Sequence, residues 1–297
     1  MERGFSLTEV MLAVLVTAIV SSAVFHLFER NEHLYRDQNL VSEMQQSARA
    51  AVSQISDEIR MAGQGTPRYA ASFGSADSEA TVAILSGSNA TRLNLRAGLS
   101  PAESSVTSPV PLTLTAAVPV TLTADSVTGF YNAIGGSPSG RFLYIWGDSG
   151  NERWQWVRAA ITSVSQGARS LQISPVEFSQ GGSTFAVAPT VSLEEALAIY
   201  RDSTTATLKH TTATNMSNPV SPSWAPANDL ATNVTQLKFD YFDESGMPIV
   251  PDSLAHRSAV AQIEVLLVVD SGQALSNGSV ASATLTMRTW IRGKTIH

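Results

Sequence analysis

The sequence predicts an α+β protein in which one long N-terminal helix packs on a C-terminal antiparallel, β-rich domain. Three observations support this prediction. An apolar run extends from Phe5 to Phe28, and helically spaced apolar residues follow from Leu34 to Ala62. After Gly65 the pattern changes to short alternating runs separated by Gly, Pro, Ser and Asn, which is typical of antiparallel strands.

The first part of the helix is predicted to span a membrane. The run from Phe5 to Phe28 contains about 24 residues, enough for a helix to cross a hydrocarbon layer of about 30 Å. Glu9 is its only charged residue. A secretory signal peptide would have a shorter apolar stretch, followed by a small-residue cleavage site that this sequence does not show.

The second part of the helix is predicted to be amphipathic. No Pro or Gly occurs between Phe5 and Ala62, so nothing in this stretch ends the helix. The apolar stripe consists of Leu34, Val41, Met44, Ala48, Val52, Ile55, Ile59 and Ala62, and the opposite face carries Asp37, Glu43, Gln46, Arg49, Ser53, Asp57 and Arg60. Gly63 is the expected C-terminal stop. Residues 5–28 therefore form the membrane half and residues 29–62 the amphipathic half.

Composition excludes several classes of function. Cysteine is absent, so the chain cannot form a disulfide framework, a thiol nucleophile, a zinc knuckle or an iron–sulfur site. The 25 acidic and 19 basic residues give a formal charge of -6. Nucleic-acid binding is not expected, because phosphate affinity comes from clustered Lys and Arg.

Residues 63–297 are predicted to form the β-rich domain. The expected strands cover residues 81–86, 91–96, 112–123, 141–146, 153–164, 171–174, 196–201, 207–210, 234–242, 260–269 and 283–291. The Ser-, Pro- and Asn-rich segments near 98–111 and 211–229 are expected to be loop insertions. The 297 residues permit one domain or two, and the pattern leaves open whether the middle of the chain forms a second one.

No residue pattern predicts catalysis or a bound cofactor. The five histidines are scattered, and no phosphate-binding glycine loop or HExxH motif occurs. We therefore expect no catalytic, cofactor or metal residues, and a protein that is not an enzyme.

Two features of the β-rich region nevertheless offer alternatives. Two clusters of oxygen ligands are more typical of polar turns than of calcium loops; they are Asp148, Asn151 and Glu152, and Asp240, Asp243 and Glu244. Aromatic residues alternate along the hairpin 141–164 as Phe142, Tyr144, Trp146, Trp154 and Trp156. This alternation favours the core face of a sheet over a stacking platform for sugars.

The first ten residues resemble the type III signal of prepilins. A short leader, residues 1–4, ends in Gly4 and is followed by Phe5, an apolar helix and Glu9 as its fifth residue. The resemblance implies that a prepilin peptidase cuts between Gly4 and Phe5 and methylates the new amino group of Phe5. Arg3 is a basic residue near this end, and basic residues favour the cytoplasmic side of a membrane. The leader is therefore expected in the cytoplasm and the β-rich domain in the periplasm.

The resemblance also implies a role for Glu9. In pilins the corresponding glutamate is an assembly contact, which pairs with the N-terminal amine of an adjacent subunit and sets the axial register. The alternative is that Glu9 extends to the lipid headgroups near the cytoplasmic face.

Further residues resemble the PilW-like minor pilins and the J-type pseudopilins of type II secretion. The segment Ile55–Gly63 is similar to the end of their long helix, and the strands expected in residues 234–292 are similar to their last three. His26 and Ala18 stand where many major pilins have Pro and Gly, which favours a minor subunit.

This resemblance implies a structural subunit of a type IV pilus priming or tip complex that initiates filament assembly. The alternatives are a J-type minor pseudopilin and a pilin-anchored adhesin or ligand-binding module. The expected partners are the prepilin peptidase, other minor pilins, the major pilin, inner-membrane lipid and, at the tip, an adhesin. The expected location is the bacterial inner membrane as a single-pass protein, then the pilus tip or cell surface.

Overall fold

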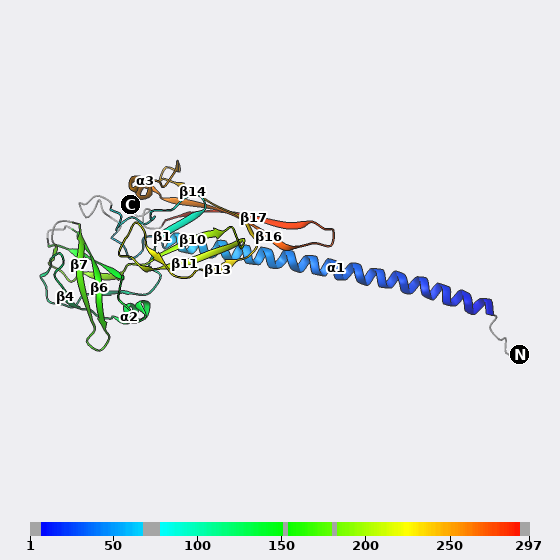
Figure 1. Cartoon of the computed structure of the whole chain (residues 1–297), viewed down its shortest axis with the longest axis horizontal. Coiled ribbons are helices and arrows are strands. Elements are labelled where there is room, and N and C mark those ends of the chain that lie inside the picture. Colours follow the sequence, from blue (N-terminus) through cyan, green and yellow to red (C-terminus); the bar gives the residue numbers. More distant parts are fainter. Residues whose placement is uncertain (1–6, 68–77, 151–153, 180–182, 292–297) are drawn as a thin grey trace.

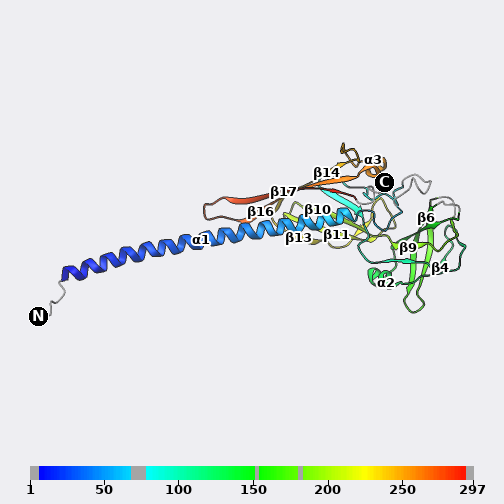
Figure 2. The same cartoon turned by 180° about the vertical axis from the view of Figure 1, so that it is seen from behind.

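The molecule is elongated, with a long helix protruding from a two-lobed body (Figure 1). The computed structural model describes residues 7–67, 78–150, 154–179 and 183–291. Helix α1 (Leu7–Arg60) extends from the N-terminal end into the body. One lobe of the body packs against one face of the second half of α1, and the other lies at the end furthest from the N-terminus (Figures 1 and 2).

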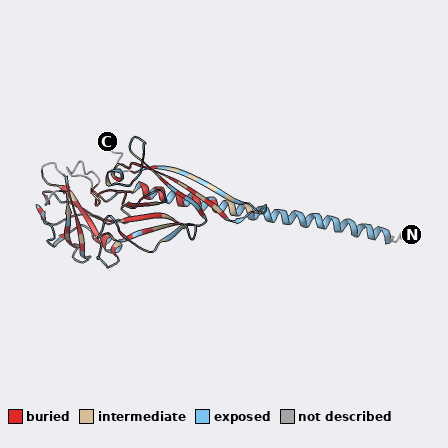
Figure 3. Ribbon diagram, turned by 45° about the horizontal axis from the view of Figure 1, so that its top comes forward, coloured by how far each residue is buried: buried red, intermediate tan, exposed pale blue. Residues whose placement is uncertain are grey.

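Helix α1 confirms the predicted uninterrupted helix and its stop. Gly63 has a φ of 69°, the left-handed conformation that ends helices and that glycine adopts without steric cost. Burial along the stripe begins later than predicted: Val41 is half-buried and Met44 is the first buried residue, whereas Leu34 is 52% exposed. Leu34, the first residue of the stripe, is thus exposed, and the packed part of α1 begins at residues 37–41; Figure 3 shows the exposed first half and the partly buried second half of the helix.

Two antiparallel sheets pack with the second half of α1 and form what we call the helix lobe. One has the order β15-β14-β16-β17, with β14 (Val234–Phe242), β15 (Pro248–Ile249), β16 (Gln262–Ala274) and β17 (Val280–Trp290). The other has the order β1-β10-β11-β12, with β1 (Arg92–Arg96), β10 (Ala196–Asp202), β11 (Thr207–Asn215) and β12 (Ser223–Trp224), and β13 (Asn228–Ala231) also pairs with β11. The short helix α3 (Leu254–Ala259) connects β15 to β16. Residues of α1 from Met44 to Ile59, together with Ala62 just after the helix, share one core with both sheets.

Several strand predictions for this lobe are confirmed and one is wrong. The predicted pairing of residues 196–201 with 207–210 is the β10–β11 ladder, and the last three predicted strands are β14, β16 and β17. The segment 81–86 is not a strand; it contacts β1 through the isolated bridge Ile84↔Leu95. The segment 211–229 contains the end of β11, all of β12 and the start of β13, so its Ser- and Asn-rich composition did not prevent strand formation.

The second lobe is a six-stranded antiparallel barrel with its own core. Its strand order is β2-β9-β5-β6-β7-β4, with β2 (Glu103–Ser105), β4 (Val120–Thr123), β5 (Phe142–Asp148), β6 (Trp154–Ser165), β7 (Ser170–Phe178) and β9 (Thr190–Leu193). The two outer strands meet through the bridge Val106↔Ala124, where the Thr107 amide donates to the Thr123 carbonyl at 2.7 Å. The sheet therefore closes on itself and has no free edge at this point.

Two small elements contribute to the barrel core. Helix α2 (Thr128–Ile134) contributes Phe130 and Ile134, and the ribbon of β3 (Leu112–Leu114) and β8 (Ser183–Phe185) contributes Leu112, Leu114 and Phe185. The predicted strand 112–123 is thus two strands, β3 and β4, in different sheets, and β2 lies within the predicted loop segment 98–111.

The barrel is inserted into a β-hairpin of the helix lobe. Strands β1 and β10 are antiparallel neighbours whose last pair is Arg96↔Ala196, and the Ala97 amide donates to the Glu195 carbonyl at 3.2 Å. Residues 98–194 leave and rejoin the helix lobe at adjacent positions. An insertion with adjacent ends leaves the host sheet undisturbed.

A buried charged cluster joins the two lobes. Glu194 accepts hydrogen bonds from Arg96 Nε at 2.8 Å, from Arg158 Nε at 2.7 Å and from the Tyr144 hydroxyl at 2.9 Å. Arg96 belongs to the helix lobe, whereas Arg158 and Tyr144 belong to the barrel. Burial raises the pKa of Tyr144, so the phenol stays protonated and can donate a hydrogen bond to the Glu194 carboxylate.

Candidate functional site: the N-terminal helix

No other part of the described chain covers the first half of α1. Every residue from Leu7 to Arg36 is exposed, including the large apolar side chains of Leu12, Ile19 and Phe25. Among the described residues, α1 is the one helix long and apolar enough to cross a membrane. An exposed apolar surface of this length is stable only in lipid or against other apolar helices.

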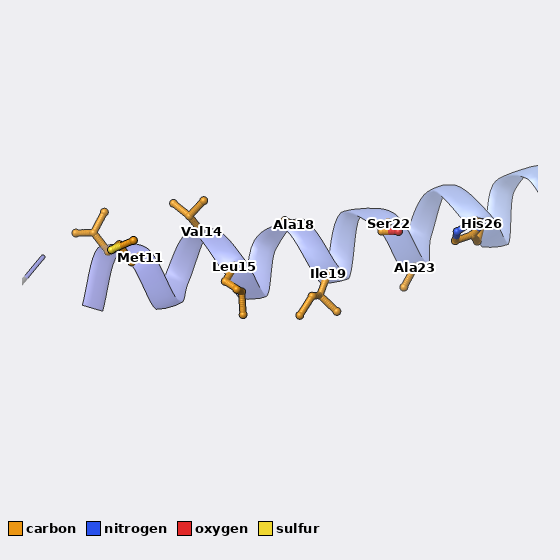
Figure 4. Close-up of a pocket in the computed structure, with 9 residues that line it drawn as sticks. Met11, Val14, Leu15, Ala18, Ile19, Ser22, Ala23 and His26 are labelled. Atoms are coloured by element: carbon orange, nitrogen blue, oxygen red, sulfur yellow. The ribbon is translucent and has the colours of Figure 1, made fainter. Parts of the chain in front are cut away.

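One open face of this half is built from residues at helical spacing (Figure 4). Met11, Leu15, Ile19 and Ala23 follow one another at intervals of four, beside Val14, Ala18, Ser22 and His26. The row of large side chains Met11, Leu15 and Ile19 lies beside the small side chains of Ala18 and Ser22. Such a surface accepts lipid chains or the ridges of a neighbouring helix.

Glu9 lies at the N-terminal end of a second face, which is lined mainly by small residues. The other members of this face are Val10, Ala13, Val14, Thr17, Ala18 and Ser21. Small side chains at intervals of four allow the backbones of two membrane helices to approach closely. The position of Glu9 beside this face is consistent with its predicted role as a contact to a neighbouring helix. Gly4 and Phe5, the predicted cleavage and methylation residues, lie outside the described residues.

The boundary between the exposed and packed parts of α1 is marked by a contact that the sequence pattern did not reveal. The Asp37 carboxylate accepts hydrogen bonds from the Ser276 amide at 3.0 Å and from the Ser276 hydroxyl at 2.5 Å. Ser276 lies in the tip of the β16–β17 hairpin, which extends along α1 toward the N-terminus (Figures 1 and 2). These hydrogen bonds lower the pKa of Asp37.

A second polar contact lies near the other end of α1. Glu58 is buried, and its Oε1 is 3.3 Å from Nε2 of His210 on β11. Burial raises the pKa of Glu58, and the nearby His210 opposes this shift. This pair joins the helix to a sheet and lies far from the membrane half, so we assign it to the packing of the helix lobe.

The structure also locates the residues considered for calcium and sugar binding. Asp243 accepts from the Ser245 hydroxyl and the Met247 amide in a turn, and Asp240 pairs with Lys238 at 2.7 Å. Asn151 and Glu152 lie outside the described residues. Among the residues that are described, no group of three or more His, Cys, Asp or Glu is placed to hold a metal ion.

The aromatic residues of the β5–β6 hairpin lie on the face opposite to the barrel core, which is formed by Leu143, Ile145, Val157 and Ala159. Phe142, Tyr144 and Trp156 are buried, Trp146 is half-buried, and Trp154 is 49% exposed. This face is mostly buried, as predicted, but Phe142 and Tyr144 pack at the junction with the helix lobe and not in the barrel core. The described aromatic residues do not form a continuous exposed platform.

Comparison with known proteins bears on the same N-terminal segment. Residues 1–25 match the family model described as the prokaryotic N-terminal methylation motif. Searches of curated proteins and of solved structures found no match to the chain. The matched segment contains the predicted cleavage site, Glu9 and most of the membrane half. The motif and the exposed apolar helix that carries it support a type IV pilin-like protein or pseudopilin, anchored in a membrane, processed by a prepilin peptidase and assembled with other pilins.

Proposed function

We propose that this chain is a PilW-like minor pilin that joins other minor pilins in a priming complex and remains at the filament tip. The observation that carries the proposal is the prepilin motif on a fully exposed apolar half-helix, continuous with a helix half that is packed into the body. Such a helix serves as a membrane anchor before assembly and as a packing element within a filament.

The shape of the body supports a tip position. The barrel lies at the end of the molecule furthest from the membrane half (Figure 1). At a filament tip this lobe would have free space beyond it, whereas the interior of a shaft would place further subunits there. His26 and Ala18, in place of the Pro and Gly of many major pilins, agree with a minor role.

Glu9 is the residue proposed to control assembly. A carboxylate at the centre of a membrane helix costs about 2.5–3.5 kcal/mol on insertion scales. Glu9 lies nearer the end of the apolar run and bears part of this cost, and charged residues within membrane helices are usually functional. Cleavage after Gly4 would create a positive amine on Phe5, and the amine of an adjacent subunit is the proposed partner of Glu9.

The test replaces Glu9 by Leu and compares this variant with Glu32→Leu, which changes an exposed glutamate of the same helix outside the membrane half. Glu9→Leu should insert, be cleaved and accumulate normally, yet reduce filament number at least tenfold. Glu32→Leu should leave filament number unchanged. Wild-type filament numbers with Glu9→Leu would show that Glu9 is not the assembly contact.

Immunogold labelling of purified filaments tests the tip position. Label confined to one end is expected, and label along the shaft would contradict a tip subunit. Neighbouring genes for a secretin and a G-type major pseudopilin would instead favour the J-type pseudopilin.

The barrel favours a second candidate, a ligand-binding module carried by a pilin anchor. This candidate is supported by the closed barrel, which has a separate core and is inserted at one point of the helix lobe. Antibody fragments against the exposed turn at residues 166–169 should block attachment of filament-bearing cells if this candidate is correct, and leave attachment unchanged if it is not.

A further inference from the structure

One long strand of the structure has no neighbour on its second side. β17 is the last strand in the order β15-β14-β16-β17, and within the described part of the chain it pairs with β16 alone. It contains 11 residues, from Val280 to Trp290. An open edge of this length presents a row of backbone donors and acceptors that can pair with another chain.

The other described sheet edges are short or covered. On the opposite side of the same sheet, the end of β14 pairs with the two-residue strand β15, which begins with Pro248 and is followed by Pro251. The rest of this side of β14 is contacted by the other sheet and its loops, because the Val234 and Phe239 amides donate to the Ala206 and Ala90 carbonyls. β1 is covered through the bridges Ile84↔Leu95 and Asn89↔Arg92. β12 has two residues, β13 has four, and β3 and β8 have three each. The barrel closes on itself at Val106 and Ala124. These are the devices by which proteins prevent unwanted strand pairing.

β17 has none of these devices. It contains neither Pro nor Lys, and Arg288 is its one charged residue. The Arg288 guanidinium lies 3.7 Å from the centre of the Phe242 ring on β14, so it points across the sheet and does not guard the open edge. Val280 and Trp290 are 54% and 45% exposed.

The face of β17 that packs on the helix-lobe core is incompletely covered. Four apolar side chains on this face are only partly buried, and they are Ala281, Ala283, Leu285 and Met287. A strand added beside β17 would place its own side chains next to this row and complete its burial.

The backbone alternation shows which amides are available. The Ile291 amide donates to the Ala261 carbonyl at 2.9 Å, which places the odd-numbered residues of β17 in hydrogen-bonded pairs with β16. The even-numbered residues therefore direct their N–H and C=O groups to the open edge. These residues include Ser282, Thr284 and Thr286.

We infer that the open edge of β17 is the docking site for an extended segment of a different prepilin-type subunit anchored in the same membrane. This inference rests on the proposed function, which supplies co-anchored subunits. β17 runs alongside the packed half of α1, and the Asp37–Ser276 contact holds its hairpin beside the helix (Figures 1 and 2). Subunits standing side by side in the membrane would therefore meet this edge laterally.

The geometry favours a different chain over a second copy. Antiparallel pairing of β17 with β17 would point the two α1 helices in opposite directions, whereas both must enter the membrane with the same orientation. Successive copies in a filament meet through different surfaces, so β17 of one copy would need another open edge on the next. The other described edges of this chain are short or covered.

The test replaces Thr286 by Pro and compares it with Thr286→Val. Proline removes an amide that faces the open edge, and edge strands tolerate such a change because no bond to β16 is lost. Valine keeps the amide and the β-branched shape. The full-length variants are co-expressed with each prepilin-type protein encoded beside this gene, and complexes are purified in mild detergent.

We expect Thr286→Pro to recover at least tenfold less of one partner, with Thr286→Val and wild type equal. Equal recovery with both variants would overturn the inference. If wild type recovers no prepilin-type partner, the proposed function fails as well. If only Glu9→Leu weakens recovery, the proposed function stands and the β17 inference fails.

Two measurements remain decisive if Thr286→Pro does not fold. In the wild-type complex, NMR amide exchange at Ser282, Thr284 and Thr286 should slow at least tenfold relative to the free protein; unchanged exchange would contradict strand addition. Because the chain has no cysteine, Ser282→Cys provides a single crosslinking site. A disulfide-linked homodimer at this position would overturn the assignment to a different chain.

Discussion

The two lobes solve the problem of sheet edges in different ways. The barrel joins its two outer strands at Val106 and Ala124, so the backbone of these strands is paired within the lobe at that point. In the part of the chain that the structure describes, the helix lobe leaves β17 open along 11 residues and exposes half of its long helix. A closed sheet, as in the barrel, suits a module displayed away from the membrane. An open strand edge and an exposed apolar helix, as in the helix lobe, suit a part that neighbouring subunits complete.

The strongest test of this comparison is the charged cluster that joins the lobes. Glu194→Ala would leave the buried guanidinium groups of Arg96 and Arg158 without their carboxylate, and breaking a buried ion pair costs about 3–5 kcal/mol. Urea denaturation of the full chain in detergent measures this loss. Glu103→Ala, an exposed barrel residue, should change stability by less than about 0.5 kcal/mol. A loss below about 1 kcal/mol for Glu194→Ala would show that the cluster does not hold the lobes together.

A matched pair of core substitutions tests whether the lobes are separate cooperative units. Ile55 belongs to the helix-lobe core and Ile145 to the barrel core, and both are fully buried. Ile55→Val and Ile145→Val should each cost about 0.5–1.5 kcal/mol, because each removes one buried methylene. Hydrogen exchange followed by mass spectrometry should show the loss of protection mainly in the lobe that carries the change. Equal loss in both lobes would mean that the body unfolds as one unit.

The smallest effect is expected at the hairpin tip. The folded-state pKa of Asp37 is lowered, so its contribution is present above the ordinary aspartate pKa of about 4 and is lost as pH falls through the folded-state value. The NMR shift of the Ser276 amide should therefore titrate at acidic pH in the wild type and stay constant in Asp37→Asn. Asp57→Asn, which changes an exposed aspartate on the same helix, should leave that titration unaltered. Titration of Ser276 in Asp37→Asn would assign the effect to another group.

The sequence predicted what depends on local pattern. The uninterrupted helix, its stop at Gly63 and the last three strands follow from spacing and glycine chemistry, and the N-terminal motif identified the processing signal. The assembly role of Glu9 and the cleavage after Gly4 remain predictions. The closure of the barrel at Val106 and Ala124 was not predictable, because it joins strands separated by other strands of the same sheet.

Long-range polar contacts were missed for a related reason. Arg96 and Glu194 are 98 positions apart, and neither belongs to a recognisable motif. Asp37 was assigned to the polar face of the helix, and only the fold brings Ser276 beside it. The apolar stripe includes the exposed Leu34, because the spacing of apolar residues does not reveal where the covering sheet ends.

The insertion of the barrel between adjacent strands also bears on the order of folding. Pairing Arg96 with Ala196 in an unfolded chain would close a loop of about 100 residues, at an entropic cost of about 4 kcal/mol. A folded barrel already holds its two ends together, as the hydrogen bond from the Leu193 amide to the Ala102 carbonyl at 2.9 Å shows. Once the barrel has formed, the β1–β10 ladder can form between neighbours without paying that cost again. The barrel is therefore expected to fold before the β1–β10 ladder forms. The sheet β1-β10-β11-β12 can then complete the core around α1 only after the barrel has brought β10 back beside β1.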